Sequence, residues 1–441
     1  ADMSRERAKK YGVPIFRTVA DALTLGGDKL AVDGVILIGE HGDYPFNDKE
    51  QRLYPRFEMF LKITDVFRQS GRSVPVFNDK HLSFSFRQAK RMVEISREMK
   101  FPMLAGSSVP VAMRIPSIDA PSFIAMDEPR HTAQRKTVAP IVAPSNLANM
   151  EGLIRERTQK VLDGLPRGEV FDWADRVSTE LTAMMLATLF DFPQAERRKL
   201  TYWSDVAIAN VEDEAAVVKS EAERLAELSR MGQTMAVLWK ERAAAAPKFD
   251  LISMLAHSPA TQNMPLNEFI GTFGLLIVGG NDTTRNSMSG GVMALAENPG
   301  QLEKVRANRG LVPNLVSEII RYQTPVLHMR RTTTRQAELG GKVIPAGSKV
   351  VMWYISGNFD ETAITDPEAF DIERPKVRHH LSFGAGIHRC VGDRLAEMQL
   401  RILWEEILAR DLSIEIAGPP VRLYSNFIRG IRSLPVRIQA G

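Results

Sequence analysis

Short apolar runs alternate with stretches of helical hydrophobic period over the first part of the chain. The apolar runs lie at 35–39, 74–77 and 102–108, and amphipathic stretches lie between them at 54–67 and 86–99. Strands that alternate with helices in this way favour a parallel sheet, because parallel pairs need long crossover connections. We therefore expect residues 1–117 to form an α/β segment. It contains no Gly-x-Gly-x-x-Gly motif, so a dinucleotide site has no support there.

From about residue 118 the hydrophobic period becomes mostly helical. Strand-like pieces are short and fall in the last third, at 341–344, 349–354 and 412–416. The pattern predicts a mainly α fold with small β-sheets over residues 118–441. The expected helices are 144–162, 173–190, 196–210, 215–245, 265–297, 299–307, 311–322 and 392–410.

Composition adds limits rather than a function. The 441 residues are 44% hydrophobic and 25% charged, which excludes disorder, collagen and coiled coil. The net charge of +4 is interspersed, so we expect no nucleic-acid partner. The apolar stretches are far shorter than the roughly 20 residues of a membrane span, and the N-terminus lacks a signal-peptide pattern, so we expect a cytoplasmic protein without a span. A single cysteine, Cys390, allows no intrachain disulfide and fits a reducing compartment.

The only cysteine lies in a glycine-rich loop, directly before a strongly periodic helix. The loop reads Phe383-Gly-Ala-Gly-Ile-His-Arg-Cys-Val-Gly392, and its glycines allow positive φ and a close backbone approach to something flat. The helix N-terminus would stabilise a thiolate at Cys390, which is a good ligand for iron. Taken alone, a lone cysteine is most often a buried structural thiol. A zinc site would need more ligands than His388 and Cys390.

A weak stretch interrupts the long helical pattern of 265–297. Gly279-Gly-Asn-Asp-Thr-Thr284 has poor helix propensity, and each glycine costs roughly 1 kcal/mol relative to alanine. The stretch is either a turn with Asn281 and Asp282 at an N-cap, or a functional distortion that opens the hydrogen-bond ladder of one continuous helix. Apolar periodicity on both sides favours the continuous helix.

These two stretches resemble cytochromes P450, whose haem loop has the pattern Phe-x-x-Gly-x-His-x-Cys-x-Gly. The resemblance covers 118–441 and implies haem b, with Cys390 as the axial thiolate ligand of the iron. It places Gly279 and Gly280 in the oxygen-binding groove of the distal helix. Asp282 would feed protons, and Thr283 would hydrogen-bond the bound dioxygen. The remaining cofactor-binding residues of the loop would be Phe383, Gly384, Gly386, His388 and Gly392.

Further motifs match the same family. Glu318 and Arg321 stand three residues apart on a predicted helix, and alone they would be an exposed pair worth a few tenths of a kcal/mol. By resemblance they form a buried structural cluster with Arg374 that supports the haem loop.

Basic residues match the propionate-binding positions of the family. The segment before residue 136 resembles the family's His-x-x-x-Arg helix. The resemblance implies that two haem propionates bind to His131, Arg135, Arg331 and His388. Each charge-assisted contact would contribute about 1.5 to 3 kcal/mol.

Within the superfamily, 276–291, 323–331 and 379–383 look like bacterial alkane terminal hydroxylases. That resemblance implies a monooxygenase that uses O2 to hydroxylate the terminal methyl of medium-chain alkanes or fatty acids. Electrons would come from NADH through ferredoxin reductase and ferredoxin, which could dock near Arg389, Arg135 and Lys136. An apolar pocket would bind the hydrophobic substrate. Its expected lining is Leu275, Ile277, Val278, Gly279, Leu327 and Phe427.

Two departures limit the match. The family usually has Asn-Arg-Asp where this chain has Asn358-Phe359-Asp360, so an arginine contact is lost. The first 117 residues do not match and resemble an α/β oxidoreductase-like fragment. We therefore expect a fusion or chimera in which the haem domain lacks its usual N-terminal part and the substrate pocket is incomplete. The alternatives are a non-catalytic haem-binding protein, an inactive fusion product, or an α/β dehydrogenase-like enzyme.

Overall fold

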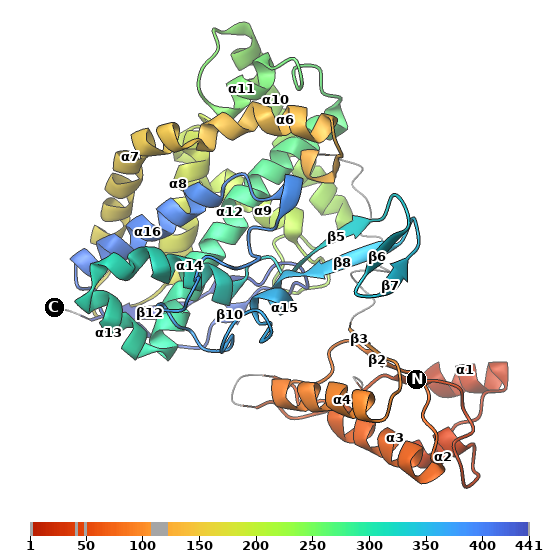
Figure 1. Ribbon diagram of the computed structural model, residues 1–441. Coiled ribbons are helices and arrows are strands. Elements are labelled where there is room, and N and C mark those ends of the chain that lie inside the picture. Colours follow the sequence, from red (N-terminus) through yellow and green to blue (C-terminus); the bar gives the residue numbers. More distant parts are fainter. Residues whose placement is uncertain (1–2, 40–42, 48–50, 107–121, 440–441) are drawn as a thin grey trace. The chain divides into compact units, whose positions relative to one another are not determined.

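The structure is a computed structural model that describes residues 3–39, 43–47, 51–106 and 122–439. The chain divides into two compact units, Ala1–Ile115 and Pro116–Gly441. Figure 1 shows the elements of each unit. None of the helices in the described ranges is both long and apolar enough to cross a membrane.

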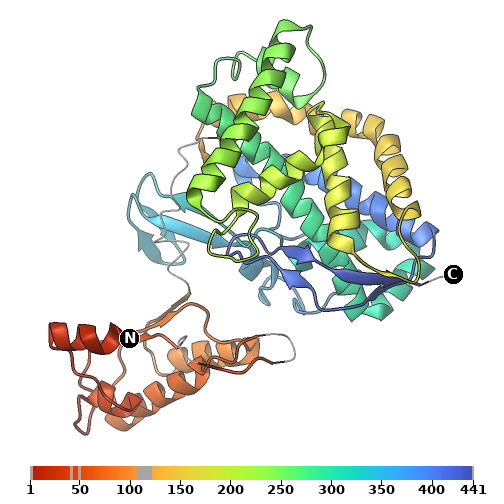
Figure 2. The ribbon, with the colours of Figure 1, turned by 180° about the vertical axis from the view of Figure 1, so that it is seen from behind.

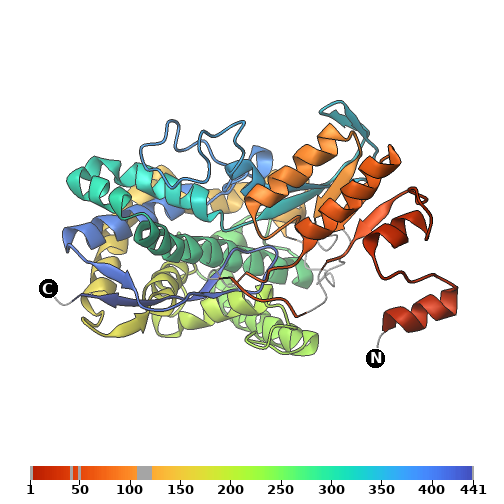
Figure 3. The same cartoon turned by 90° about the horizontal axis from the view of Figure 1, so that it is seen from below.

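The first unit holds a parallel sheet in the order β1-β2-β3. Val76 of β2 pairs with Val35 of β1 and with Met103 of β3, so the predicted parallel sheet is confirmed. α3 and α4 lie side by side (Figure 3). The elements are α1 (Met3–Tyr11), α2 (Val19–Thr24), β1 (Val35–Leu37), α3 (Arg56–Ser70), β2 (Val76–Asp79), α4 (Phe86–Glu98) and β3 (Met103–Gly106).

The second unit is mainly α-helical, as predicted. Its helices are α6 (Arg130–Val138), α7 (Pro144–Asp163), α8 (Glu180–Leu189), α9 (Arg198–Ile208), α10 (Glu221–Ala244), α11 (Leu251–His257), α12 (Leu266–Glu297), α13 (Pro299–Ala307), α14 (Val312–Gln323), α15 (Tyr354–Asn358) and α16 (Asp393–Ala409).

Small antiparallel sheets lie beside these helices. β5 pairs with β8, β6 with β7, and β10 with β11, while β12 lies between β4 and β9. Figure 2 shows the dark blue strand β12 near the C-terminus. The strands are β4 (Val170–Asp172), β5 (His328–Thr332), β6 (Ala337–Leu339), β7 (Lys342–Ile344), β8 (Lys349–Trp353), β9 (Ile414–Ile416), β10 (Val421–Arg422), β11 (Ile431–Ser433) and β12 (Pro435–Ile438).

Two predicted helices differ in their first turns. The helix predicted at 215–245 begins only at Glu221, because Ser220 caps it there. The stretch predicted as one helix over 173–190 starts as a π-helix at Ala174–Thr179 and continues as α8. The Thr179 hydroxyl donates a hydrogen bond to the carbonyl of Ala174, five residues earlier, at 2.7 Å. This wider turn explains the difference, because apolar spacing does not distinguish the two helix types over so short a stretch.

The long helix α12 runs without interruption through the predicted weak stretch. It packs against α8, α9, α14 and α16, so tertiary contacts outweigh the poor propensity of its glycines. Gly291 makes the close approach to α14 and α16 possible. A Cβ there would lie 2.8 Å from Ile319 Cδ1 and 3.2 Å from Trp404 Cζ2. The predicted turn is therefore absent from this described helix, and the continuous helix favoured by the apolar period is confirmed.

Candidate active site

The cysteine loop is shaped by two glycines in the left-handed region. Gly384 has φ +68° and Gly386 has φ +71°, which strongly favours glycine. A Cβ at Gly384 would also lie 3.0 Å from Tyr354 Oη. The loop closes where the Cys390 N–H donates to the Phe383 carbonyl at 2.8 Å. Gly392 has φ −97°, so the expectation of positive φ was wrong for this glycine, which precedes α16.

The Cys390 thiol is enclosed by protein but still accessible. The residue is exposed, while burial is the largest cause that raises the pKa of its thiol above the ordinary value. The backbone N–H of Gly392 acts in the opposite direction on this pKa, as expected at a helix start. Here burial outweighs that stabilisation of the thiolate.

The predicted basic residues converge beside this loop. The rings of His131 and His388 lie 4.2 Å apart between centroids. Burial lowers the pKa of His388, and the charges of His131, Arg331 and Arg135 lower it further. His131 is 1% exposed, and within the described residues neither of its ring nitrogens has a hydrogen-bond partner. A buried imidazole without partners is costly, so this position favours a polar ligand group.

The middle of α12 presents an open face. Gly279 is exposed, and no atom lies within 4 Å of the place where its Cβ would be. Leu275 and Val278 lie on the same face and are partly exposed. Ile277 is 1% exposed and packs in the core, so its prediction as a pocket residue is wrong. The next glycine, Gly280, instead packs closely on Leu186.

Thr283 and Asp282 point to different partners. The Thr283 hydroxyl donates to the Gly279 carbonyl at 3.1 Å, one turn earlier. Asp282 is completely buried and accepts a hydrogen bond from Ser204 of α9. Its other oxygen lies 2.6 Å from Arg285, which also contacts Asp205.

The electrostatics of Asp282 follow from this cluster. Burial raises the pKa of Asp282, although Arg285 opposes the shift. Two carboxylates share one guanidinium, and Asp205 is the one nearer to solvent, with its side chain 33% exposed. Arg285 can therefore be neutralised by Asp205, which leaves the fully buried Asp282 as the carboxylate that takes up a proton more easily.

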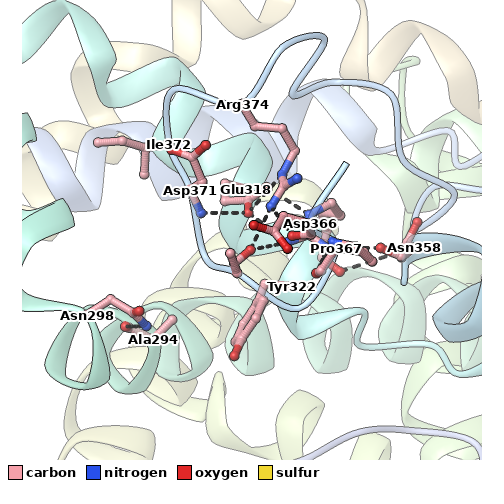
Figure 4. Close-up of polar contacts among 12 residues, drawn as sticks. Ala294, Asn298, Glu318, Tyr322, Asn358, Asp366, Pro367, Asp371, Ile372 and Arg374 are labelled. Atoms are coloured by element: carbon pink, nitrogen blue, oxygen red, sulfur yellow. Dashed lines mark hydrogen bonds and ion pairs between the residues drawn. The ribbon is translucent and has the colours of Figure 1, made fainter. Parts of the chain in front are cut away.

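The structure brings Glu318, Arg321 and Arg374 together in a buried cluster. Figure 4 shows Glu318 beside Arg374. Glu318 lies 2.7 Å from Arg321 and 3.4 Å from Arg374. It also accepts a 2.9 Å hydrogen bond from the backbone N–H of Asp371. Because both guanidinium groups donate to backbone carbonyls, such as Ala369, the cluster fixes the segment that precedes the cysteine loop.

Phe359 replaces the expected arginine with aromatic contacts. Its ring lies 5.7 Å from that of Tyr322, and the guanidinium carbon of Arg321 lies 5.3 Å from the ring centroid. The neighbouring Asn358 is buried and donates to Ser382 at 2.8 Å. The segment therefore stays tied to the cluster without an arginine at 359.

Comparison with known proteins decides the family. Residues 230–416 match the sequence profile described as cytochrome P450. A linalool 8-monooxygenase from Pseudomonas putida is 33% identical over 397 residues, covering 84% of this chain and 94% of that protein. This chain belongs to the cytochrome P450 family. As a member, it is a monooxygenase.

Two other proteins similar to this P450 carry more specific names. A methyl-branched lipid omega-hydroxylase from Mycobacterium bovis is 32% identical over 321 residues, covering 71% of this chain and 74% of that protein. The solved structure of cytochrome P450-153 from Novosphingobium aromaticivorans is 48% identical, with a TM-score of 0.68. That comparison covers 74% of this chain and 80% of the solved chain.

Cytochromes P450 hold haem through a cysteine thiolate, and the residues of this P450 fit that group. Cys390 is the only cysteine and is accessible. Both ring nitrogens of His131 lack a partner within the described residues, so the ring can turn its N–H donor toward a carboxylate. No atom lies within 4 Å of the Cβ positions of Gly279 and Gly386, so both backbones leave room for a flat group.

Some polar partners in the site were not predicted from the sequence. Arg285 follows Asp282 by three residues, a spacing that puts both on one helix face and could have indicated the pair. Ser204 comes from α9, and nothing local in the sequence connects it with Asp282. Tyr354 touches the loop at Gly384 only because β8 ends beside it.

Proposed function

We propose that this P450 hydroxylates unactivated C–H bonds, at the terminal methyl of medium-chain alkanes or fatty acids. One oxygen atom of O2 enters the C–H bond, and the other leaves as water. An electron pair from NADH, delivered through ferredoxin reductase and ferredoxin, and a matching pair of protons balance the reaction. The omega-hydroxylase and the linalool 8-monooxygenase named above support oxidation at chain ends.

Haem b, when bound, supplies the activation of O2. We assign Cys390 as its axial ligand, because the chain has no other cysteine and this thiol is accessible. This accessible thiol in a loop closed by Phe383 is the observation that carries the proposal. We assign the propionates to His131, Arg135, Arg331 and His388, whose charges act on one another.

An apolar surface would recognise the substrate by burial, at about 25 cal/mol per Å2. Leu275, Val278 and Gly279 supply such a surface on the open face of α12. Leu327 and Phe427 are linked by a 2.9 Å backbone hydrogen bond and are both partly exposed. These five residues carry no charge, which suits an alkane chain.

Asp282 and Thr283 would move protons to the reacting oxygen. Thr283 holds its hydroxyl beside the exposed turn at Gly279. Burial raises the pKa of Asp282, which makes its protonated form easier to populate than that of an exposed aspartate. To reach Thr283, the Asp282 carboxylate has to leave Arg285, and Asp205 keeps that guanidinium neutralised meanwhile.

A basic cavity supports the docking of an acidic ferredoxin. A hollow of about 270 Å3 is lined by His380, Phe383 and two carboxylates, Asp393 and Glu397, which pair with Arg389 and Arg378. Three arginines contribute positive charge to it: Arg378, Arg389 and Arg394. Arg389 precedes the thiol directly, and we include Arg135 and Lys136 in the docking surface.

We further propose that residues 1–117 contain an α/β unit joined to the P450 as a fusion. The linalool 8-monooxygenase match covers 84% of this chain and so extends into 1–117, which limits that unit to the part outside the match. Their parallel sheet with crossover helices contrasts with the antiparallel sheets of residues 118–441. The pocket for the substrate would then be incomplete. Tight, specific alkane binding by the purified chain, seen as a spectral shift with micromolar octane, would contradict that part of the proposal.

The spectrum of the reduced, CO-bound protein tests the haem assignment. A red-shifted, thiolate-type Soret band that is lost in Cys390→Ser is expected. Turnover of octane and octanoate with a surrogate ferredoxin and reductase then tests the reaction, with 1-octanol and the omega-hydroxy acid as expected products. Absence of the band in the wild-type protein would overturn the haem assignment, and products oxidised only at internal carbons would overturn terminal hydroxylation.

A further inference from the structure

Helix α6 has few apolar contacts to hold it in place. It contains nine residues, and its buried side chains are His131, Gln134 and Val138. Val138 is thus its only buried aliphatic side chain, and no side chain caps its N-terminus. Helices this short are marginal by themselves, so polar tertiary contacts add to the packing of α6 against α11.

Glu268 supplies the main contact of this kind. It lies in the first turn of α12 and is 1% exposed. One carboxylate oxygen accepts from Gln134 and the other from Arg130, so both oxygens are used by α6. A second link joins Thr137 to Ser258 at 2.9 Å.

The contacts of α6 are divided between two neighbouring rows. Arg130 and Gln134 stand four residues apart and therefore lie on one side of the helix. His131 and Arg135 each follow by one residue and form the adjacent row, which turns toward His388. Fixing the first row therefore fixes the direction of the second.

We propose that Glu268 is a positioning residue: by clamping Arg130 and Gln134 to the start of the distal helix, it aims His131 and Arg135 at the haem carboxylates. The clamp itself follows from the contacts, while the aim toward haem rests on the function proposed above. Without the contact to Glu268, α6 would lose the orientation that turns His131 and Arg135 toward the haem carboxylates. Haem would then leave the protein faster.

The experiment uses the full chain as purified and the variant Glu268→Gln, which keeps the shape but removes the negative charge and presents an N–H to one of the two donors. Hydrogen exchange over 130–138 is expected to speed up about tenfold while α14 stays unchanged. Haem transfer to excess apomyoglobin is expected to speed up by about the same factor. Glu128→Gln is the control for exchange, because Glu128 accepts from Thr132 of the same helix. Glu303→Gln, an exposed carboxylate on α13, is the control for haem loss.

A reciprocal variant separates the clamp from general damage. Glu268→Gln combined with Gln134→Glu restores a carboxylate and an amide across the contact, and it should recover most of the slow exchange and slow haem loss. Unchanged exchange over 130–138 in Glu268→Gln would overturn the clamp. Faster exchange with unchanged haem loss would overturn the positioning role. A wild-type protein without haem would overturn the proposed function, and the exchange result would still decide the clamp.

Discussion

Asp282 lies 2.6 Å from Arg285, in a part of α12 where the carboxylate has no access to solvent. Ser204 holds its other oxygen, and Asp205 shares the guanidinium. The Asp282 carboxylate, which we propose delivers protons, is therefore bound to Arg285 and Ser204, while the Thr283 hydroxyl donates to the Gly279 carbonyl. The packing of α9 on α12 therefore depends on the charges of Asp205, Asp282 and Arg285.

Removal of the cation should be strongly destabilising. Arg285→Leu leaves Asp282 buried without its counter-charge, and we expect a loss of about 3 to 5 kcal/mol in the free energy of unfolding, measured in urea. Arg230→Leu, which removes a side chain 69% exposed beside Glu227, should lose less than about 1 kcal/mol. Adding Asp282→Asn to Arg285→Leu should recover part of the loss. Equal losses in the two single variants would contradict the importance of the buried pair.

The Thr283 hydroxyl should control how electrons are used. In Thr283→Ala we expect hydroxylated product to fall about tenfold or more while NADH consumption continues and hydrogen peroxide appears. Thr283→Ser keeps a hydroxyl and should retain most of the coupling. Thr284→Val changes a buried neighbour and serves as the control. Product and peroxide are measured per NADH consumed, and unchanged coupling in Thr283→Ala would remove this hydroxyl from the reaction.

Adjacent glycines of α12 should respond differently to the same added methyl group. Gly279→Ala meets no atom within 4 Å, so the helix should gain up to about 1 kcal/mol in free energy of unfolding. In Gly280→Ala the new Cβ would lie 2.8 Å from Leu186 Cδ2, whose residue is 1% exposed. Moving Leu186 should cost about 1 to 3 kcal/mol and outweigh the helix gain. Urea unfolding of both variants tests this order, and the reverse order would contradict an open face at Gly279.

The sequence was sufficient where structure follows from local pattern. The helix at 299–307 has the predicted bounds, because Pro299 can begin a helix and the apolar period ends at Ala307. The positive φ of Gly384 and Gly386 follows from the loop motif. The π-helical start at Ala174 was missed, since apolar spacing does not report which carbonyl each N–H uses.

Contacts between distant segments were predicted only where a family motif named them. Glu318 and Arg374 are 56 residues apart and could be paired only through the resemblance. Ser204 and Asp282 are 78 residues apart, and no motif connects them, so their contact depends on how α9 packs on α12. The sequence predicts that Ile277 lies on the long helix but does not predict which face of the helix it occupies, so it does not reveal that Ile277 faces the core.

The buried carboxylate of Glu318 should be essential for folding. Glu318→Gln removes the charge that faces Arg321, whose side chain is 1% exposed, and Arg374. We expect a loss of about 3 to 5 kcal/mol in the free energy of unfolding. Arg374→Lys keeps one charge and should be milder, which allows a measurement if Glu318→Gln does not fold. Glu303→Gln changes an exposed carboxylate on α13 and is the control. Losses within about 0.5 kcal/mol of that control in both cluster variants would contradict the role.

The stability of this P450 should fall in mild acid because of His380. Burial, followed by the charge of Arg389, lowers the pKa of His380 to about 4. The unfolded imidazole titrates near 6.5, so the unfolded chain binds more protons than the folded one between these two values. The contribution of His380 to stability is therefore complete above about pH 6.5 and decreases as the pH falls toward about 4, by up to about 3 kcal/mol.

His380→Gln removes the titrating ring, so urea unfolding at pH 7.5 and pH 5 should show a smaller acid loss in the variant than in the wild type. His379→Gln, at the exposed neighbouring position, should keep the wild-type loss. The same acid loss in His380→Gln and in the wild type would show that other groups cause it.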